Sequence, residues 1–189
     1  MNKEDILTLM EKLNIEEKII LDDIPEIDLY MDQVVQLFES KLSGRKRKDE
    51  DKVLTKTMVN NYAKAKLLMS IKNKKYSKEH LILISLICDL KGALSISDIK
   101  LLLDNIVKKY EKEEEYDLRS LYNTYQKINE EDVDVFKKSV DSKIDKINNL
   151  NNKEFEEKFL LIGSMISMSN MYRRMGEKLI DELFAEGDE

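Results

Sequence analysis

Apolar residues recur every three or four positions along most of the chain, a spacing typical of amphipathic helices. Residues 4–13 form the first predicted helix, with the apolar side chains on one side. Residues 22–44 form the second, because Pro25 and several acidic residues favour its start and Gly44 stands where a C-terminal cap is expected. The charged block at residues 45–52 has no apolar anchor and is predicted to be a mobile loop.

The middle of the chain predicts three more helices and one small sheet. Thr55 is the expected N-cap of a helix that leads into Leu67 and Leu68. Residues 69–77 are too few for a helix and are predicted to form a small β-hairpin. Two helices follow, an apolar and buried one over residues 78–92 and a second one over residues 97–115.

The C-terminal part predicts long helices. Residues 116–147 form one or two helices, residues 148–152 form a break, and residues 153–184 form a final helix. Four methionines lie along one stretch of this final helix: Met165, Met168, Met171 and Met175. Methionines at such spacing fill a core or an interface, or line a groove for a small effector. An isolated helix with so broad an apolar stripe would expose too much hydrophobic surface, so we expect a homodimer through the C-terminal helices.

The composition agrees with an all-α fold, since 189 residues include one proline and five glycines. We divide the chain into an N-terminal helical segment (1–22), a central domain (23–112) and a helical C-terminal region (113–189). No apolar run is long enough to span a membrane, and the N-terminal residues do not resemble a signal peptide. The sequence therefore predicts a cytoplasmic protein with no membrane partner.

The residues that most enzymes need are scarce. The chain has one histidine, His80, and one cysteine, Cys88, which lies in an apolar helix and is expected to be a buried hydrophobe. No glycine-rich phosphate loop and no metal-ligand spacing occurs. We therefore predict no catalytic residue, no metal site and no cofactor.

Charge is unevenly distributed along the chain. The net charge is −6, but residues 41–80 contain thirteen Lys and Arg against four Asp and Glu. A basic centre between acidic flanks indicates a nucleic-acid surface, although a solvated lysine-rich surface would give the same count.

Three motifs in this basic region resemble the DNA-binding head of MerR-type regulators. They are TMVNNY at residues 57–62 followed by Leu67-Leu68, KNKKYS at residues 72–77, and LSISDI at residues 94–99. The resemblance implies a winged helix-turn-helix with a minimal β-hairpin wing. With the preceding helix included, the chain is also similar to an uncharacterised bacterial family known only as a domain of unknown function.

The chain departs from the MerR-type pattern in two places. The basic block at residues 43–53 is a long insert before the recognition helix, and Asn60-Asn61 replaces the usual Arg-Tyr pair. The contact that the arginine makes in that family therefore cannot be assigned to a residue here.

On a helix, five polar residues of segment 55–68 form one continuous stripe: Lys56, Thr57, Asn60, Asn61 and Lys64. An asparagine amide can donate to N7 of adenine through its NH₂ group and accept from the N6 amino group through its oxygen, so the pair is predicted to read base edges. The alternative is a plain solvent-facing polar surface. Lysines of the predicted wing are expected to neutralise phosphates: Lys72, Lys74 and Lys75.

Arg45 and Arg47 are predicted to belong to a flexible arm along the duplex, or else to an ordinary disordered loop. Tyr62 and Tyr76 are expected to brace the wing against the recognition helix rather than to stack on bases, and His80 to pack locally rather than to contact phosphate. These features predict a sequence-specific transcriptional regulator that binds double-stranded DNA. The alternative is a non-enzymatic helical adaptor that binds a protein.

Overall fold

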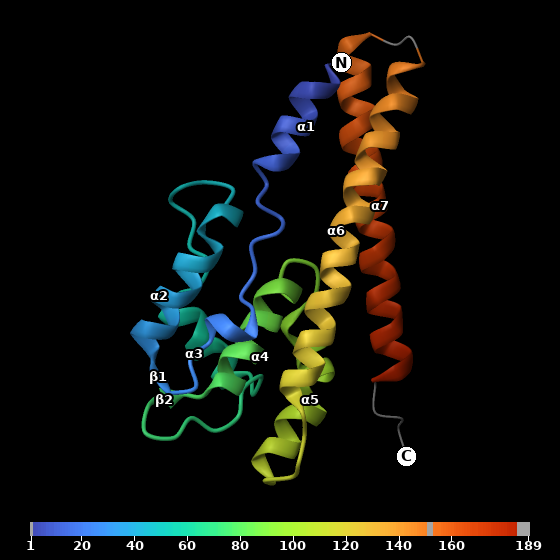
Figure 1. Cartoon of the computed structure of the whole chain (residues 1–189). Helices are drawn as coiled ribbons and strands as arrows, with labels where there is room; N and C mark the ends of the chain where they lie inside the picture. Colours follow the sequence, from blue (N-terminus) through green and yellow to red (C-terminus); the bar gives the residue numbers. More distant parts are fainter. Residues whose placement is uncertain (1, 151–152, 185–189) are drawn as a thin grey trace.

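The apolar spacing of the sequence produces seven α-helices and one two-stranded antiparallel sheet within residues 2–150 and 153–184, which this computed structural model describes (Figure 1). The all-α prediction is therefore confirmed. The helices are α1 (Lys3–Glu11), α2 (Met31–Leu42), α3 (Lys56–Lys64), α4 (Lys78–Leu90), α5 (Ile96–Glu111), α6 (Leu118–Asn148) and α7 (Glu154–Leu183). The strands are β1 (Leu29–Tyr30) and β2 (Lys75–Tyr76), and the short 3₁₀ helices are η1 (Leu21–Asp23) and η2 (Ser43–Arg45).

Side-chain caps define where the central helices begin. Thr55 Oγ1 accepts a hydrogen bond from the Met58 amide at 3.1 Å, which confirms the predicted N-cap of α3. The predicted second helix is shorter than expected, because α2 begins only at Met31. Pro25 disfavours helical geometry at the residue before it, and Ile24 is accordingly extended.

The small sheet joins segments that are far apart in the sequence. Leu29 pairs with Tyr76 and Tyr30 pairs with Lys75. The predicted hairpin within residues 69–77 is therefore wrong, since β2 finds its partner before α2. Leu29 and Tyr76 are both buried, and this pairing lets both side chains enter the core.

The main core surrounds α4 and takes side chains from Ile19 to Tyr122. Most residues of α4 are buried, as its apolar sequence predicts. The Tyr122 hydroxyl donates to the Ile19 carbonyl and lies 2.8 Å from Ser85 Oγ of α4, so the first turns of α6 are fixed to the core. This core extends beyond both ends of the predicted 23–112 domain.

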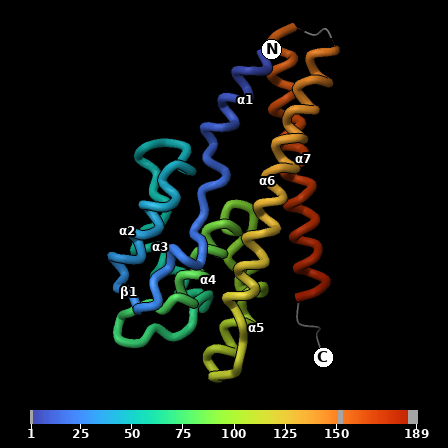
Figure 2. The backbone as a smooth tube through the Cα atoms, viewed as in Figure 1, coloured from blue at the N-terminus to red at the C-terminus, as the bar shows by residue number. Residues whose placement is uncertain are grey.

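A second, smaller core lies at the far end of α6. It joins Val140, Ile144 and Ile147 to Leu161 of α7, and α1 packs against it. Lys3 of α1 adds ion pairs to Asp141 and Asp145 of α6 at 2.7 and 2.8 Å. Figure 2 shows the chain running from α1 down to the main core, while α6 spans both cores.

The region predicted as one or two helices is the single helix α6. It ends at Asn148, where the predicted break begins; residues 151–152 of that break lie outside the described residues. The last five residues of the predicted C-terminal region also lie outside them.

Candidate nucleic-acid interface

The helix α3 is anchored on one side and open on the other. Val59 and Tyr62 are 0% and 4% exposed and pack in the main core. The polar stripe on the opposite side is exposed along its whole length: Lys56, Thr57, Asn60, Asn61 and Lys64. The amide groups of both asparagines are therefore available to a ligand.

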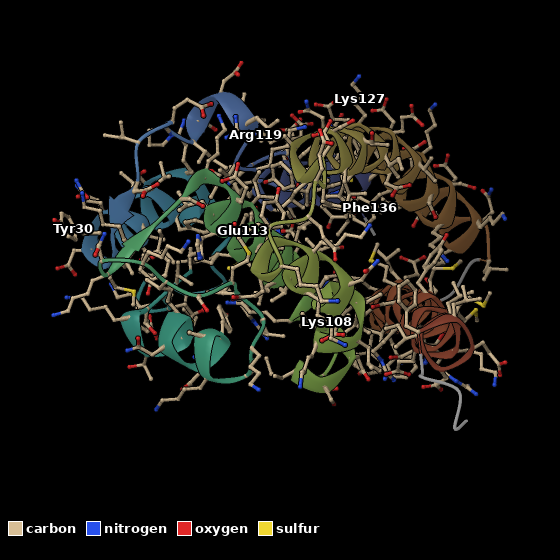
Figure 3. All side chains as sticks on the ribbon, turned by 90° about the horizontal axis from the view of Figure 1, so that it is seen from below. Tyr30, Lys108, Glu113, Arg119, Lys127 and Phe136 are labelled. Carbon is tan, nitrogen blue, oxygen red and sulfur yellow. The ribbon has the colours of Figure 1, made fainter. Side chains whose placement is uncertain are left out.

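The C-terminal helices do not cover this stripe. In Figure 3, α3 (teal) lies at an outer edge of the molecule, and α5 lies between it and α7. On its inner side α3 contacts α2, which packs into the same core. The stripe therefore projects from a rigid support rather than from a loop.

Unpaired lysines follow α3 along the chain. Within the described residues, no ion pair involves the exposed side chains of Lys64, Lys66, Lys72 or Lys74. At the other end of α3, Lys56 forms an ion pair with Asp32, and both side chains are exposed. An ion pair this exposed contributes little free energy, so Lys56 can exchange Asp32 for another anion.

Lys75 differs from the other two predicted wing lysines. It is only half-exposed, and its Nζ lies 5.2 Å from the centroid of the Tyr30 ring, in a cation–π contact. Lys75 therefore fixes β2 against β1, while Lys72 and Lys74 extend into solvent.

Two basic residues near α3 were missed by the sequence analysis. Lys66 and Lys100 line a groove of about 980 Å³ between the end of α3 and α5. Lys66 has a positive φ of 59°, which turns the chain immediately after α3. Lys100 is distant in the sequence and reaches the groove only because α5 packs beside this turn, so no local pattern could have identified it.

The basic block before α3 is tied to the fold. Arg45 forms an ion pair with Asp89 of α4, with 3.0 Å between the guanidinium nitrogen and Oδ1. Lys46 forms an ion pair with Glu39 of α2, with 2.8 Å between Nζ and Oε1. The hydrogen bond from Lys46 is the main reason why the pKa of Glu39 is lowered. Arg45 is therefore paired with the body of the fold rather than part of a free arm, and so is Lys46 of the predicted mobile loop, whereas the side chain of Arg47 is exposed.

A family model described as a domain of unknown function, DUF1836, matches residues 19–125. The chain belongs to the DUF1836 family. The matched range coincides with the main core, which runs from Ile19 to Tyr122, and it leaves out α1 and α7. No curated protein and no solved structure matches the chain. The predicted similarity to a domain-of-unknown-function family is thus confirmed.

Tyr62 and Tyr76, the two tyrosines of the DUF1836 domain that the motifs near α3 contain, are buried rather than exposed. Burial raises the pKa of Tyr62 to about 12. Tyr76 is also buried, and its ring meets that of His80 edge-on, with the centroids 5.8 Å apart. Neither tyrosine is accessible for base stacking, in agreement with the structural role predicted for both.

The ring of His80 is held in place by two neighbours. The Ser77 amide donates to Nδ1 at 3.2 Å, and Nε2 lies 3.3 Å from the Met69 carbonyl oxygen. Burial lowers the pKa of His80 below its ordinary value of 6.5. The predicted local role of His80 is therefore confirmed.

This pKa shift predicts a pH-dependent stability. On acidification the unfolded chain binds the imidazole proton first, so stability is complete above about pH 6.5 and falls as the pH drops toward the folded pKa of His80. The melting temperature is expected to be lower at pH 5.5 than at pH 7.5, and His80→Gln should show a smaller difference. Equal differences for both proteins would contradict the assignment.

A second cavity, of about 660 Å³, lies between residues 15–18 and α6. The buried Gln126 is among its lining residues, and Gln126 Oε1 has no hydrogen-bond partner. Neither this cavity nor the groove beside α3 is lined by the four methionines predicted as a possible effector groove.

The described residues form neither a metal-binding cluster nor a membrane-spanning helix. No cluster of three or more His, Cys, Asp or Glu side chains in this part of the chain could hold a metal ion. No helix there combines the length and apolarity that crossing a membrane would require.

Proposed function

We propose that this protein is a sequence-specific transcriptional regulator that inserts α3 into the major groove of double-stranded DNA. The observation that carries the proposal is the exposure of Asn60 and Asn61 side by side on a helix whose other side is buried. One asparagine amide offers a donor and an acceptor, which match N7 and N6 of adenine. An exposed helix of nine residues fits the width of the major groove.

The order of the elements also supports the proposal. A supporting helix (α2), an exposed helix (α3), a basic loop ending in β2 and a buried helix (α4) follow one another, as in the MerR-type head that the motifs resemble. Here β2 is completed by β1, which precedes α2, so the wing consists of the loop between α3 and β2. In Figure 1 this loop (green) projects at the lower left, beside the sheet.

Cations on both sides of the asparagines would position the helix on the duplex. Thr57 could contact a thymine methyl group or a phosphate, with Lys56 and Lys64 towards the two ends of α3. Lys66, Lys72 and Lys74 would meet phosphates along the groove edge, and all three side chains are exposed. Phosphate contacts would supply affinity, while the two asparagines would supply selectivity.

Because phosphate contacts would supply the affinity, the affinity for DNA should depend steeply on salt concentration. With about four to six phosphates neutralised per protomer, log affinity should fall with log salt concentration at a slope of roughly −4 to −5. Replacing Lys72 and Lys74 with alanine should make the slope shallower by about 2, because each lost phosphate contact removes about 0.9. Fluorescence anisotropy with a labelled duplex at several salt concentrations measures both slopes.

The matched control replaces Lys127 and Lys138, two exposed lysines of α6, and should leave the slope unchanged. Lys127 lies at the opposite side of the molecule from α3 in Figure 3. A slope near zero for the unsubstituted chain, or equal changes for both pairs of substitutions, would contradict the proposed interface. A protein adaptor would give the first of these results.

A further inference from the structure

The groove between the end of α3 and α5 is elongated and has an apolar floor. Its lining residues on α5 recur every three or four positions from Ser97 to Lys112, so they form one face of the helix. A stretch of this length spans about 22 Å along a helix. The segment from Ala63 to Ile71 supplies the other lining residues, and both sides contribute apolar side chains: Leu68, Met69, Ile71, Leu101 and Val107. The groove therefore offers hydrophobic contact to an elongated ligand.

The charges around the groove favour an anion. Four lysines and two carboxylates line it: Lys66, Lys100, Lys108, Lys112, Asp104 and Glu111. Both carboxylates already have partners, since Glu111 accepts hydrogen bonds from the amide and the hydroxyl of Ser70, and Asp104 forms an ion pair with the lysine four residues later. No ion pair within the described residues involves the exposed side chains of Lys66 or Lys100. These two lysines are available to a negatively charged group.

We propose that this groove binds an anionic amphiphile, an unbranched carboxylate with a long hydrocarbon chain. The hydrocarbon chain would lie along the apolar floor, and the carboxylate would pair with Lys66 and Lys100. The volume of about 980 Å³ falls within the range of roughly 300–1,000 Å³ that is usual for small-molecule sites. Burial of the hydrocarbon chain would supply most of the affinity, while the lysines would select the charge.

Macromolecules fit this groove less well than a single hydrocarbon chain. The phosphates of a DNA duplex could reach the lysines, but they would leave the apolar floor uncovered. A helix of a partner protein is about 10–12 Å wide, so one as long as the groove would need roughly twice its volume. An extended peptide would need free backbone partners, whereas the amide of Ser70 is already bonded to Glu111.

The proposed ligand would also regulate DNA binding. Lys66 lines the groove and belongs to the proposed DNA interface, so a bound carboxylate and a duplex phosphate would compete for it. This consequence rests on the proposed function, whereas the ligand site itself does not. Decanoate should therefore lower the affinity for a labelled duplex in fluorescence anisotropy. Unchanged duplex affinity with the groove occupied would overturn the competition.

Isothermal titration calorimetry of the full chain without DNA tests the site alone. Dodecanoate, decanoate and octanoate, each below its micelle concentration, should bind with an affinity that falls by about fourfold for each methylene removed. Acetate lacks the hydrocarbon chain and decyltrimethylammonium lacks the negative charge, so neither should bind measurably. Affinity for either one equal to that for decanoate, or no binding of any long-chain carboxylate, would overturn the proposal.

Substitution of the two lysines without an ion pair tests their role. Lys66→Gln combined with Lys100→Gln should weaken decanoate binding by roughly tenfold, because the carboxylate loses both partners. The matched control, Lys127→Gln combined with Lys138→Gln on α6, should bind decanoate as the unsubstituted chain does. Circular dichroism checks that both double variants fold. Equal decanoate affinities for the two double variants would refute the assignment.

Photo-crosslinking locates the bound chain, since α7 also exposes apolar side chains such as Ile166 and Met171. A decanoate analogue that carries a diazirine on its hydrocarbon chain is bound to the full chain and irradiated, and the modified peptides are identified by mass spectrometry. The adducts should fall within residues 63–71 and α5, and excess decanoate should suppress them. Adducts found mainly on α7 would overturn the proposed site.

Discussion

Replacing Asn60 and Asn61 together with alanine is expected to abolish selection among DNA sequences while non-specific binding persists. Each bidentate amide contact to adenine contributes about 1–3 kcal/mol of discrimination, so preference for the best duplex should fall at least about tenfold. The lysines around α3 are untouched, and their salt-dependent contacts with phosphate should remain. In-vitro selection from random duplexes, run in parallel with the unsubstituted chain, measures the change.

The matched control for this prediction is Asn123→Ala, which removes an exposed amide from α6 rather than from α3. It should select the same sequences as the unsubstituted chain. If the double variant selects the same sequences as the unsubstituted chain, the two amides do not read bases and merely face solvent. Both asparagines are exposed, so neither substitution should affect folding.

Tyr62→Ala is expected to lower the free energy of unfolding by about 3–5 kcal/mol, because truncating a buried aromatic side chain leaves a cavity. Tyr62 is 4% exposed and, with Val59, joins α3 to the main core. Tyr62→Phe keeps the ring and should retain most of the stability. Urea unfolding followed by circular dichroism gives both values. A loss below about 1 kcal/mol for Tyr62→Ala would show that α3 does not depend on this anchor.

The features that were predictable from the sequence are those that local patterns determine. The Thr55 cap and the spacing of Val59 and Tyr62 define both the start and the buried side of α3, so the exposed position of Asn60 and Asn61 followed directly. The burial of α4 was equally plain, because its run from Leu81 to Cys88 is apolar apart from Ser85. For these elements the tertiary structure agrees with the local preference.

The features that escaped prediction depend on contacts between distant segments. Tyr76 pairs with Leu29, which lies 47 positions earlier in the sequence, and both side chains enter the main core. Arg45 was predicted to belong to a mobile arm because no partner lies near it in the sequence, whereas its actual partner, Asp89, lies on α4. Lys100 reaches the groove beside α3 only through the packing of α5. No periodicity within one segment indicates such pairings.

Selection from random DNA duplexes with the unsubstituted full chain tests the central proposal most directly. We expect enrichment of a defined sequence that includes adenines, at positions that lose their preference when Asn60 and Asn61 are replaced. A selected pool as random as the starting pool, with the protein folded and at low salt, would contradict the proposal that the exposed stripe of α3 reads DNA.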